Sequence, residues 1–191
     1  MKAALDFYFD FSSPYGYLAS QKIEALAAKH GRGVTWRPML LGAAFKVSGV
    51  QPLVNVPLKG EYSKRDFLRS ARFYEVPFRV PDPFPISTLH ACRAFYAAPA
   101  EKQVPLAKAL FKAYFVDSIN IGEADNVLKI AAAVGLKPDV NDQAVKDKTR
   151  AEVDAAVAKG VFGSPYIVVD GEPFWGTDRF DQLERWLKAP F

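Results

Sequence analysis

The chain has few of the residues on which redox and metal sites depend. It contains one cysteine, Cys92, and two histidines, His30 and His90, among 191 residues. One cysteine cannot form an internal disulfide, and this set of side chains predicts no zinc site. Cys92 lies in a helix-like run, residues 88–95, and a small buried residue is the interpretation we favour over a nucleophile.

Long apolar runs and basic clusters are also missing. The chain reaches Asp6 before any apolar stretch forms, which predicts no signal peptide, and the apolar run 130–134 is far shorter than a bilayer requires. Lys and Arg total 25 against 21 for Asp and Glu, and the basic residues are scattered singly or in pairs. We therefore expect a cytoplasmic protein with no membrane or nucleic-acid partner.

The N-terminal part predicts a strand, a helix and a second strand. Apolar residues alternate from Leu5 to Phe11, which is typical of a strand with one apolar face. Ser13 then fits a helix N-cap and Pro14 the first helical position, with helical spacing continuing to residues 30–31. Residues 34–38 indicate a second strand that ends at a proline.

The middle and the C-terminal part differ in pattern. Residues 41–159 favour helices, and residues 166–175 favour a hairpin around Asp170-Gly171, before a last helix that Thr177 or Asp178 can cap. The order βαβ, helices, ββα predicts an α/β, thioredoxin-like domain (1–40 plus 160–191) interrupted by an all-helical inserted domain (41–159). The helices predicted within the insertion span 61–74, 87–97, 102–115, 123–134 and 142–159.

The helix start at Ser13 is the first candidate site. In dithiol oxidoreductases of this scaffold the helix opens with Cys-x-x-Cys, whereas this chain has Ser13-Pro14-Tyr15-Gly16 and cannot exchange disulfides by itself. Ser13 also has no adjacent general base. It is either an ordinary helix cap or a hydrogen-bond donor to a thiolate that a ligand brings.

The energies permit the second role. A thiol of pKa ~8.5 needs a shift of about two units, or ~2.7 kcal/mol, to ionise at neutral pH. A hydrogen bond to a charged group contributes ~1.5–3 kcal/mol, and a helix N-terminus ~0.3–2 kcal/mol.

Two C-terminal motifs could complete such a site. Ser164-Pro165 precedes an apolar strand, and its context favours a cis peptide bond, which would let the Ser164 backbone pair with a bound peptide. Thr177 and Asp178 open the last helix, where backbone N–H groups can bind a carboxylate and Asp178 can accept from an ammonium.

These motifs resemble those of the 2-hydroxychromene-2-carboxylate isomerases, which are similar to kappa-class glutathione transferases and share the thioredoxin-like fold with a helical insertion. The resemblance covers essentially the whole chain. It runs through residues 7–19, Trp36-Arg37-Pro38, Leu41-Gly42, Lys59-Gly60, residues 160–165 and residues 174–179.

The resemblance implies a glutathione-dependent isomerase that interconverts 2-hydroxychromene-2-carboxylate and trans-o-hydroxybenzylidenepyruvate, or a related aromatic ring-cleavage product, by reversible thiolate addition. It also implies a homodimer. Ser13 would hold the glutathione sulfur, with Pro14 and Tyr15 beside it. The other implied glutathione contacts are Ser164 before Pro165 at the cysteinyl backbone, Thr177 and Asp178 at the γ-glutamyl end, and Lys59 at the glycyl carboxylate.

The predicted substrate site has three candidate residues. Arg37 could pair with the substrate carboxylate, and Tyr17 and Phe84 could wall an aromatic pocket. The family often has asparagine where this chain has Val50, so either Gln51 or Asn55 substitutes for it, or substrate handling differs. The alternatives are a kappa-like glutathione transferase and a non-catalytic module that binds glutathione or a peptide; a disulfide oxidoreductase fits least.

Overall fold

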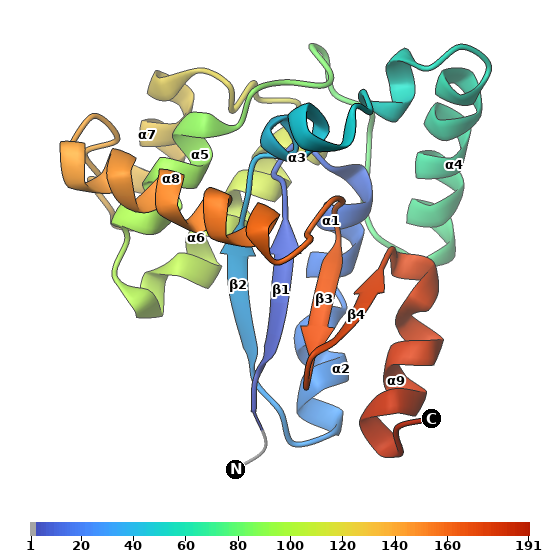
Figure 1. The fold of residues 1–191 in the computed structure, drawn as a ribbon. Coiled ribbons are helices and arrows are strands. Elements are labelled where there is room, and N and C mark those ends of the chain that lie inside the picture. The colour runs from blue at the N-terminus through green and yellow to red at the C-terminus, as the bar shows by residue number, and fades with distance from the viewer. Residues whose placement is uncertain (1–2) are drawn as a thin grey trace.

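The computed structural model describes residues 3–191, and Figure 1 shows a central sheet with helices around it. The strands are β1 (Leu5–Phe9), β2 (Val34–Pro38), β3 (Tyr166–Val169) and β4 (Glu172–Trp175), arranged in the order β2-β1-β3-β4. β1 is parallel to β2 and antiparallel to β3, which is antiparallel to β4. The predicted βαβ and ββα order is confirmed.

Helices fill the rest of the chain. The crossover between β1 and β2 consists of α1 (Pro14–Ser20) and α2 (Ile23–Lys29), and α9 (Phe180–Lys188) follows β4. The helices predicted between residues 61 and 159 are all present, with ends shifted by two residues at most. They are α4 (Lys59–Phe73), α5 (Leu89–Ala97), α6 (Ala100–Phe115), α7 (Ala124–Ala133) and α8 (Gln143–Ala158).

The first predicted helix is divided in two. The Ser20 hydroxyl donates to the carbonyl of Tyr17 at 2.6 Å, and Gln21 N–H bonds to Leu18 rather than one residue further back. Such serine bonding to the preceding turn bends helices. The prediction of one helix up to residues 30–31 was therefore wrong at Gln21.

One helix was not predicted. It is α3 (Leu41–Ser48), which begins where Leu41 N–H donates to the Asp10 carboxylate at 2.7 Å and ends at Gly49 in the left-handed region. A short 3₁₀ helix, η1 (Leu53–Asn55), follows it. Because the acceptor for Leu41 lies 31 residues away, no local capping pattern marks the start of α3.

The sheet buries side chains on both faces. Phe7 and Phe9 of β1 are fully buried in a large cluster that includes Leu18 of α1 and Phe111 of α6. Tyr8 belongs to a second cluster, together with Ala156 near the end of α8, which crosses the front of the sheet in Figure 1. Alternation along β1 therefore sends successive side chains into two different cores.

The same large cluster joins the two predicted domains. It contains Phe7 from the N-terminal part and Phe95 and Phe111 from the predicted insertion. The division into 1–40 plus 160–191 and 41–159 stays a prediction. Cys92 is fully buried in this cluster, where burial raises its pKa well above the usual value, so its interpretation as a small core residue is confirmed.

The hairpin between β3 and β4 is also confirmed. Asp170 has φ 53° and Gly171 has φ 90°, so the turn takes the positive φ values that Asp-Gly favours. The hairpin sets the carboxyl end of β4 beside the start of β3, since Trp175 pairs with Tyr166. Residues 164–165 and 176–178 are thereby brought together.

Candidate functional site

One large cleft, of about 2170 Å³, lies beyond the carboxyl ends of β1 and β2. Ligand pockets of small molecules typically measure ~300–1,000 Å³, so this cleft has room for more than one small molecule. Eight of the residues predicted for the site line it. They are Ser13, Pro14, Tyr15, Lys59, Phe84, Ser164, Thr177 and Asp178.

Ser13 is the N-cap of α1, as predicted, with Pro14 at the first helical position. Its hydroxyl oxygen accepts from Gly16 N–H at 3.0 Å and donates to the carbonyl of Ser164 at 3.0 Å. The Ser13 hydroxyl proton is therefore engaged within the protein, and only 6% of the residue is exposed. To donate to a ligand, Ser13 has to release the Ser164 carbonyl.

The Ser164–Pro165 peptide bond is cis, as the sequence indicates. Ser164 lines the cleft, and its hydroxyl oxygen accepts from Asp10 N–H at 3.0 Å. Pro165 is buried behind it rather than lining the cleft, and its carbonyl accepts from Gly176 N–H at 3.1 Å. Pro165 thus joins the Ser164 segment to the loop that precedes Thr177.

Gly16 keeps the two serines close together. A Cβ atom at this position would lie 2.5 Å from the Ser164 hydroxyl oxygen and 3.3 Å from that of Ser13. Both hydroxyl groups therefore pack against Gly16, and a side chain at this position would clash with Ser164.

Asp10 organises the floor of the cleft and was not predicted as a site residue. Its buried carboxylate accepts from Ser12 N–H at 2.8 Å, Leu41 N–H at 2.7 Å and the Thr88 hydroxyl at 2.8 Å. Burial raises the pKa of Asp10, and the three donors oppose that shift. One carboxylate therefore ties the loop before α1 to the starts of α3 and α5.

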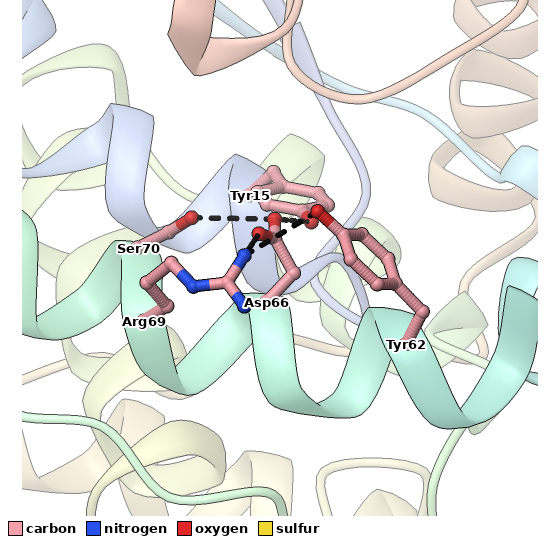
Figure 2. A network of polar contacts seen from close by, with 5 residues as sticks. All are labelled: Tyr15, Tyr62, Asp66, Arg69 and Ser70. Carbon is pink, nitrogen blue, oxygen red and sulfur yellow. Dashed lines mark hydrogen bonds and ion pairs between the residues drawn. The ribbon is translucent and has the colours of Figure 1, made fainter.

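Tyr15 leads to a polar network on α4, which Figure 2 shows. Its hydroxyl donates to Asp66 at 2.5 Å, and Arg69 donates to the other oxygen of Asp66 at 2.8 Å. Two effects raise the pKa of Tyr15: burial, which is the larger, and the hydrogen bond to Asp66. The phenol therefore stays protonated. The guanidinium of Arg69 in turn lies over the Tyr62 ring, 5.6 Å from its centroid.

Lys59 is the first residue of α4. Leu58, just before it, has φ 67° at the centre of a γ-turn closed by Lys59 N–H and the Pro57 carbonyl at 2.8 Å. Lys59 is exposed and makes no ion pair within residues 3–191. Its charge is available to an anion in the cleft.

Thr177 and Asp178 do not cap the last helix, so that prediction was wrong. They begin a 3₁₀ turn, η2 (Thr177–Arg179), and α9 begins after it with no side-chain cap. Thr177 is buried and its carbonyl accepts from the Tyr74 hydroxyl at 3.0 Å. Asp178 is mostly exposed and accepts from Arg179 at 3.1 Å.

Arg37 and Tyr17 lie away from the cleft, contrary to their predicted place in the substrate site. Arg37 projects from β2 and pairs with Asp6 at 2.7 Å and with Glu152 at 3.6 Å. The Tyr17 ring is buried against Phe115, and its hydroxyl donates to the Pro77 carbonyl at 2.8 Å. Both side chains are engaged in contacts with other parts of the scaffold.

Comparison with known proteins identifies the fold family. The model of the DSBA-like thioredoxin domain matches residues 4–188. The chain belongs to this DSBA-like thioredoxin family. The predicted thioredoxin-like fold is thereby confirmed.

Three known proteins are similar to this chain over nearly its whole length. A 2-hydroxychromene-2-carboxylate isomerase from Sphingobium xenophagum is 33% identical, covering 98% of this chain and 99% of the isomerase. Glutathione S-transferase kappa 1 from Rattus norvegicus is 28% identical, covering 96% of this chain and 92% of the transferase. A solved 2-hydroxychromene-2-carboxylate isomerase superposes with a TM-score of 0.84 at 26% identity, over 97% of this chain and 94% of the other. The predicted membership of this isomerase family of enzymes is confirmed.

The cleft also contains residues that were not predicted as site residues. Phe162 and Trp175 line it with 45% and 55% of their surface exposed, and their rings lie 4.9 Å apart. Lys46 of α3 lines it as well and, like Lys59, makes no ion pair among the described residues. Of the two candidates to replace the family's asparagine, Gln51 lines the cleft and Asn55 does not.

Residues 3–191 contain no group of three His, Cys, Asp or Glu side chains that could hold a metal ion. None of the helices in this part of the chain is both long and apolar enough to cross a bilayer.

Proposed function

We propose that this chain is a glutathione-dependent isomerase that interconverts 2-hydroxychromene-2-carboxylate and trans-o-hydroxybenzylidenepyruvate, or a related aromatic ring-cleavage product. The observation that carries the proposal is the buried Ser13 hydroxyl beside Ser164 at the floor of a large cleft, in a chain 33% identical to such an isomerase. The cofactor would be glutathione and the partner a small aromatic carboxylate. A cytoplasmic location and a homodimer stay predictions.

The residues present fit glutathione. Its sulfur would lie at Ser13, beside Pro14 and Tyr15, and its peptide would follow the Ser164–Pro165 segment. Lys59, which makes no ion pair, would hold the glycyl carboxylate, and Thr177 with Asp178 the γ-glutamyl end. All of these residues except Pro165 line the same cleft, and Pro165 anchors the Gly176 N–H just before Thr177.

When bound, glutathione supplies a thiolate whose reversible addition to the enone makes a carbon–carbon double bond single and free to rotate. The protein has to keep that thiol ionised at neutral pH. Ser13 contributes a hydrogen bond to the charge, while α1, with only seven residues, adds little through its dipole. The burial of Ser13 strengthens this bond, because water does not compete for the hydroxyl.

The substrate carboxylate needs a cation other than Arg37. Arg69 pairs with Asp66 and Arg179 with Asp178, whereas Lys46 and Lys59 line the cleft without an ion pair. Since Lys59 would hold glutathione, Lys46 is the cation left for the substrate.

An aromatic substrate would also meet apolar side chains in the cleft. Phe84, which the sequence predicted, and the exposed rings of Phe162 and Trp175 all line it. Burying these exposed rings against an aromatic substrate is favourable, because it removes apolar surface from water.

A kappa-like glutathione transferase is the second candidate, favoured by the 28% identity to the rat kappa enzyme over nearly the whole chain. The two activities differ in mass balance. An isomerase leaves the glutathione concentration unchanged, whereas a transferase consumes one glutathione for each product. A non-catalytic module would bind glutathione and turn over no substrate.

The test is to follow hydroxychromene carboxylate by ultraviolet absorbance with and without glutathione, while free thiol is titrated in the same samples. We expect conversion to the open-chain isomer only with glutathione, and no loss of thiol. Loss of thiol in step with product would indicate the transferase. Binding of glutathione without conversion of this or other enones would indicate the non-catalytic module.

A further inference from the structure

Ser164 carries a hydroxyl group whose proton has no acceptor among the described residues. Its oxygen accepts from Asp10 N–H at 3.0 Å, and none of the hydrogen bonds of residues 3–191 uses it as a donor. The residue is 9% exposed and lines the cleft. The proton is therefore free to be donated into the cleft.

The Ser13 hydroxyl differs in this respect. Its proton goes to the Ser164 carbonyl, and its oxygen accepts from Gly16 N–H. A bond from Ser13 to a ligand replaces an existing hydrogen bond, whereas a bond from Ser164 adds one.

The two hydroxyl groups lie close to the same backbone position of α1, and both residues line the cleft. A Cβ on Gly16 would lie 2.5 Å from the Ser164 hydroxyl oxygen and 3.3 Å from that of Ser13. Asp10 N–H fixes the Ser164 oxygen from behind, and an N–H bonded to a hydroxyl oxygen makes that hydroxyl a better donor.

We propose that the Ser164 side chain is a second hydrogen-bond donor to the ligand's sulfur, acting together with Ser13. The inference rests on the proposed function, because it needs a thiolate at Ser13. It supplies a second donor that stabilises the thiolate and so helps to lower the pKa of the bound thiol. Ser164 then acts through its side chain as well as through its backbone.

The test compares two ligands by calorimetry above neutral pH: glutathione, and S-methylglutathione, which has no thiol to ionise. Ser164→Ala also removes the acceptor of Asp10 N–H, and this loss affects both ligands alike. Because only glutathione also loses a bond to charged sulfur, its affinity should fall roughly ten- to a hundredfold more than that of S-methylglutathione. Ser70→Ala is the matched control, because the Ser70 hydroxyl lines the same cleft and donates only to Asp66 at 3.4 Å.

Ser164→Thr is the control for misfolding, because its hydroxyl group can still accept from Asp10 N–H and donate to the ligand. It should retain the preference for glutathione. If Ser164→Ala lowers the affinities for both ligands equally, Ser164 has a structural role and the inference is overturned. The inference is also overturned if Ser164→Ala leaves the preference for glutathione over S-methylglutathione unchanged while Ser13→Ala abolishes that preference. If the unmutated protein binds neither ligand, the proposed function fails together with the inference.

Discussion

Replacing Ser13 with alanine should lower turnover of the enone by about one to two orders of magnitude at saturating glutathione. The substitution removes a buried donor to the thiolate, and it leaves the Ser164 hydroxyl as the remaining one. The bound thiol then ionises less at neutral pH, and the fraction of reactive cofactor falls. Steady-state kinetics with glutathione in excess measure the effect.

The control for this experiment is Asp142→Ala. Asp142 caps α8 by accepting from Val145 N–H at 3.0 Å, as Ser13 caps α1, but it does not line the cleft. Both variants lose one helix cap, worth about 0.5–2 kcal/mol. Only Ser13→Ala should lose turnover, and equal turnover in the two variants would contradict the role of Ser13.

Replacing Asp10 with alanine should lower the free energy of unfolding by about 3–5 kcal/mol, because three donors lose their buried acceptor at once. The Ser12 and Leu41 N–H groups and the Thr88 hydroxyl would be left without a partner. The start of α3 and the loop before α1 should loosen together, and glutathione affinity should fall with them. Urea unfolding followed by circular dichroism gives the free energy.

Asp154→Ala is the matched control for Asp10. Asp154 is 71% exposed and pairs with Arg150 only at 3.7 Å, so its loss should change the free energy of unfolding by less than about 1 kcal/mol. A similarly small change for Asp10→Ala would show that Asp10 does not hold the site together.

Features set by neighbouring residues could be predicted from the sequence. The cap at Ser13, the first-turn proline, the Asp170-Gly171 turn and the helices between residues 61 and 159 each depend on a local pattern. The Ser164–Pro165 segment was also found from its neighbours, and the hairpin brings it to the same cleft as Ser13.

Features set by distant partners could not be predicted. Asp10 looks like any polar residue of an alternating strand, and its three donors come from three separate segments. The place of Arg37 could not be predicted either, because its partners Asp6 and Glu152 are far away in sequence. The Arg37 side chain pairs with these two carboxylates and does not line the cleft. The prediction for Tyr17 failed because its ring packs in the core, although its position on α1 adjoins the site residues.

The central claim is that the protein ionises a thiol that it does not itself carry. The most direct measurement is the pKa of the glutathione thiol in the complex. It is obtained by monitoring the thiolate absorbance as a function of pH. The account predicts a value lowered from ~8.5 by about two units, and partly restored in Ser13→Ala. A bound thiol that titrates as it does in free solution would contradict the account.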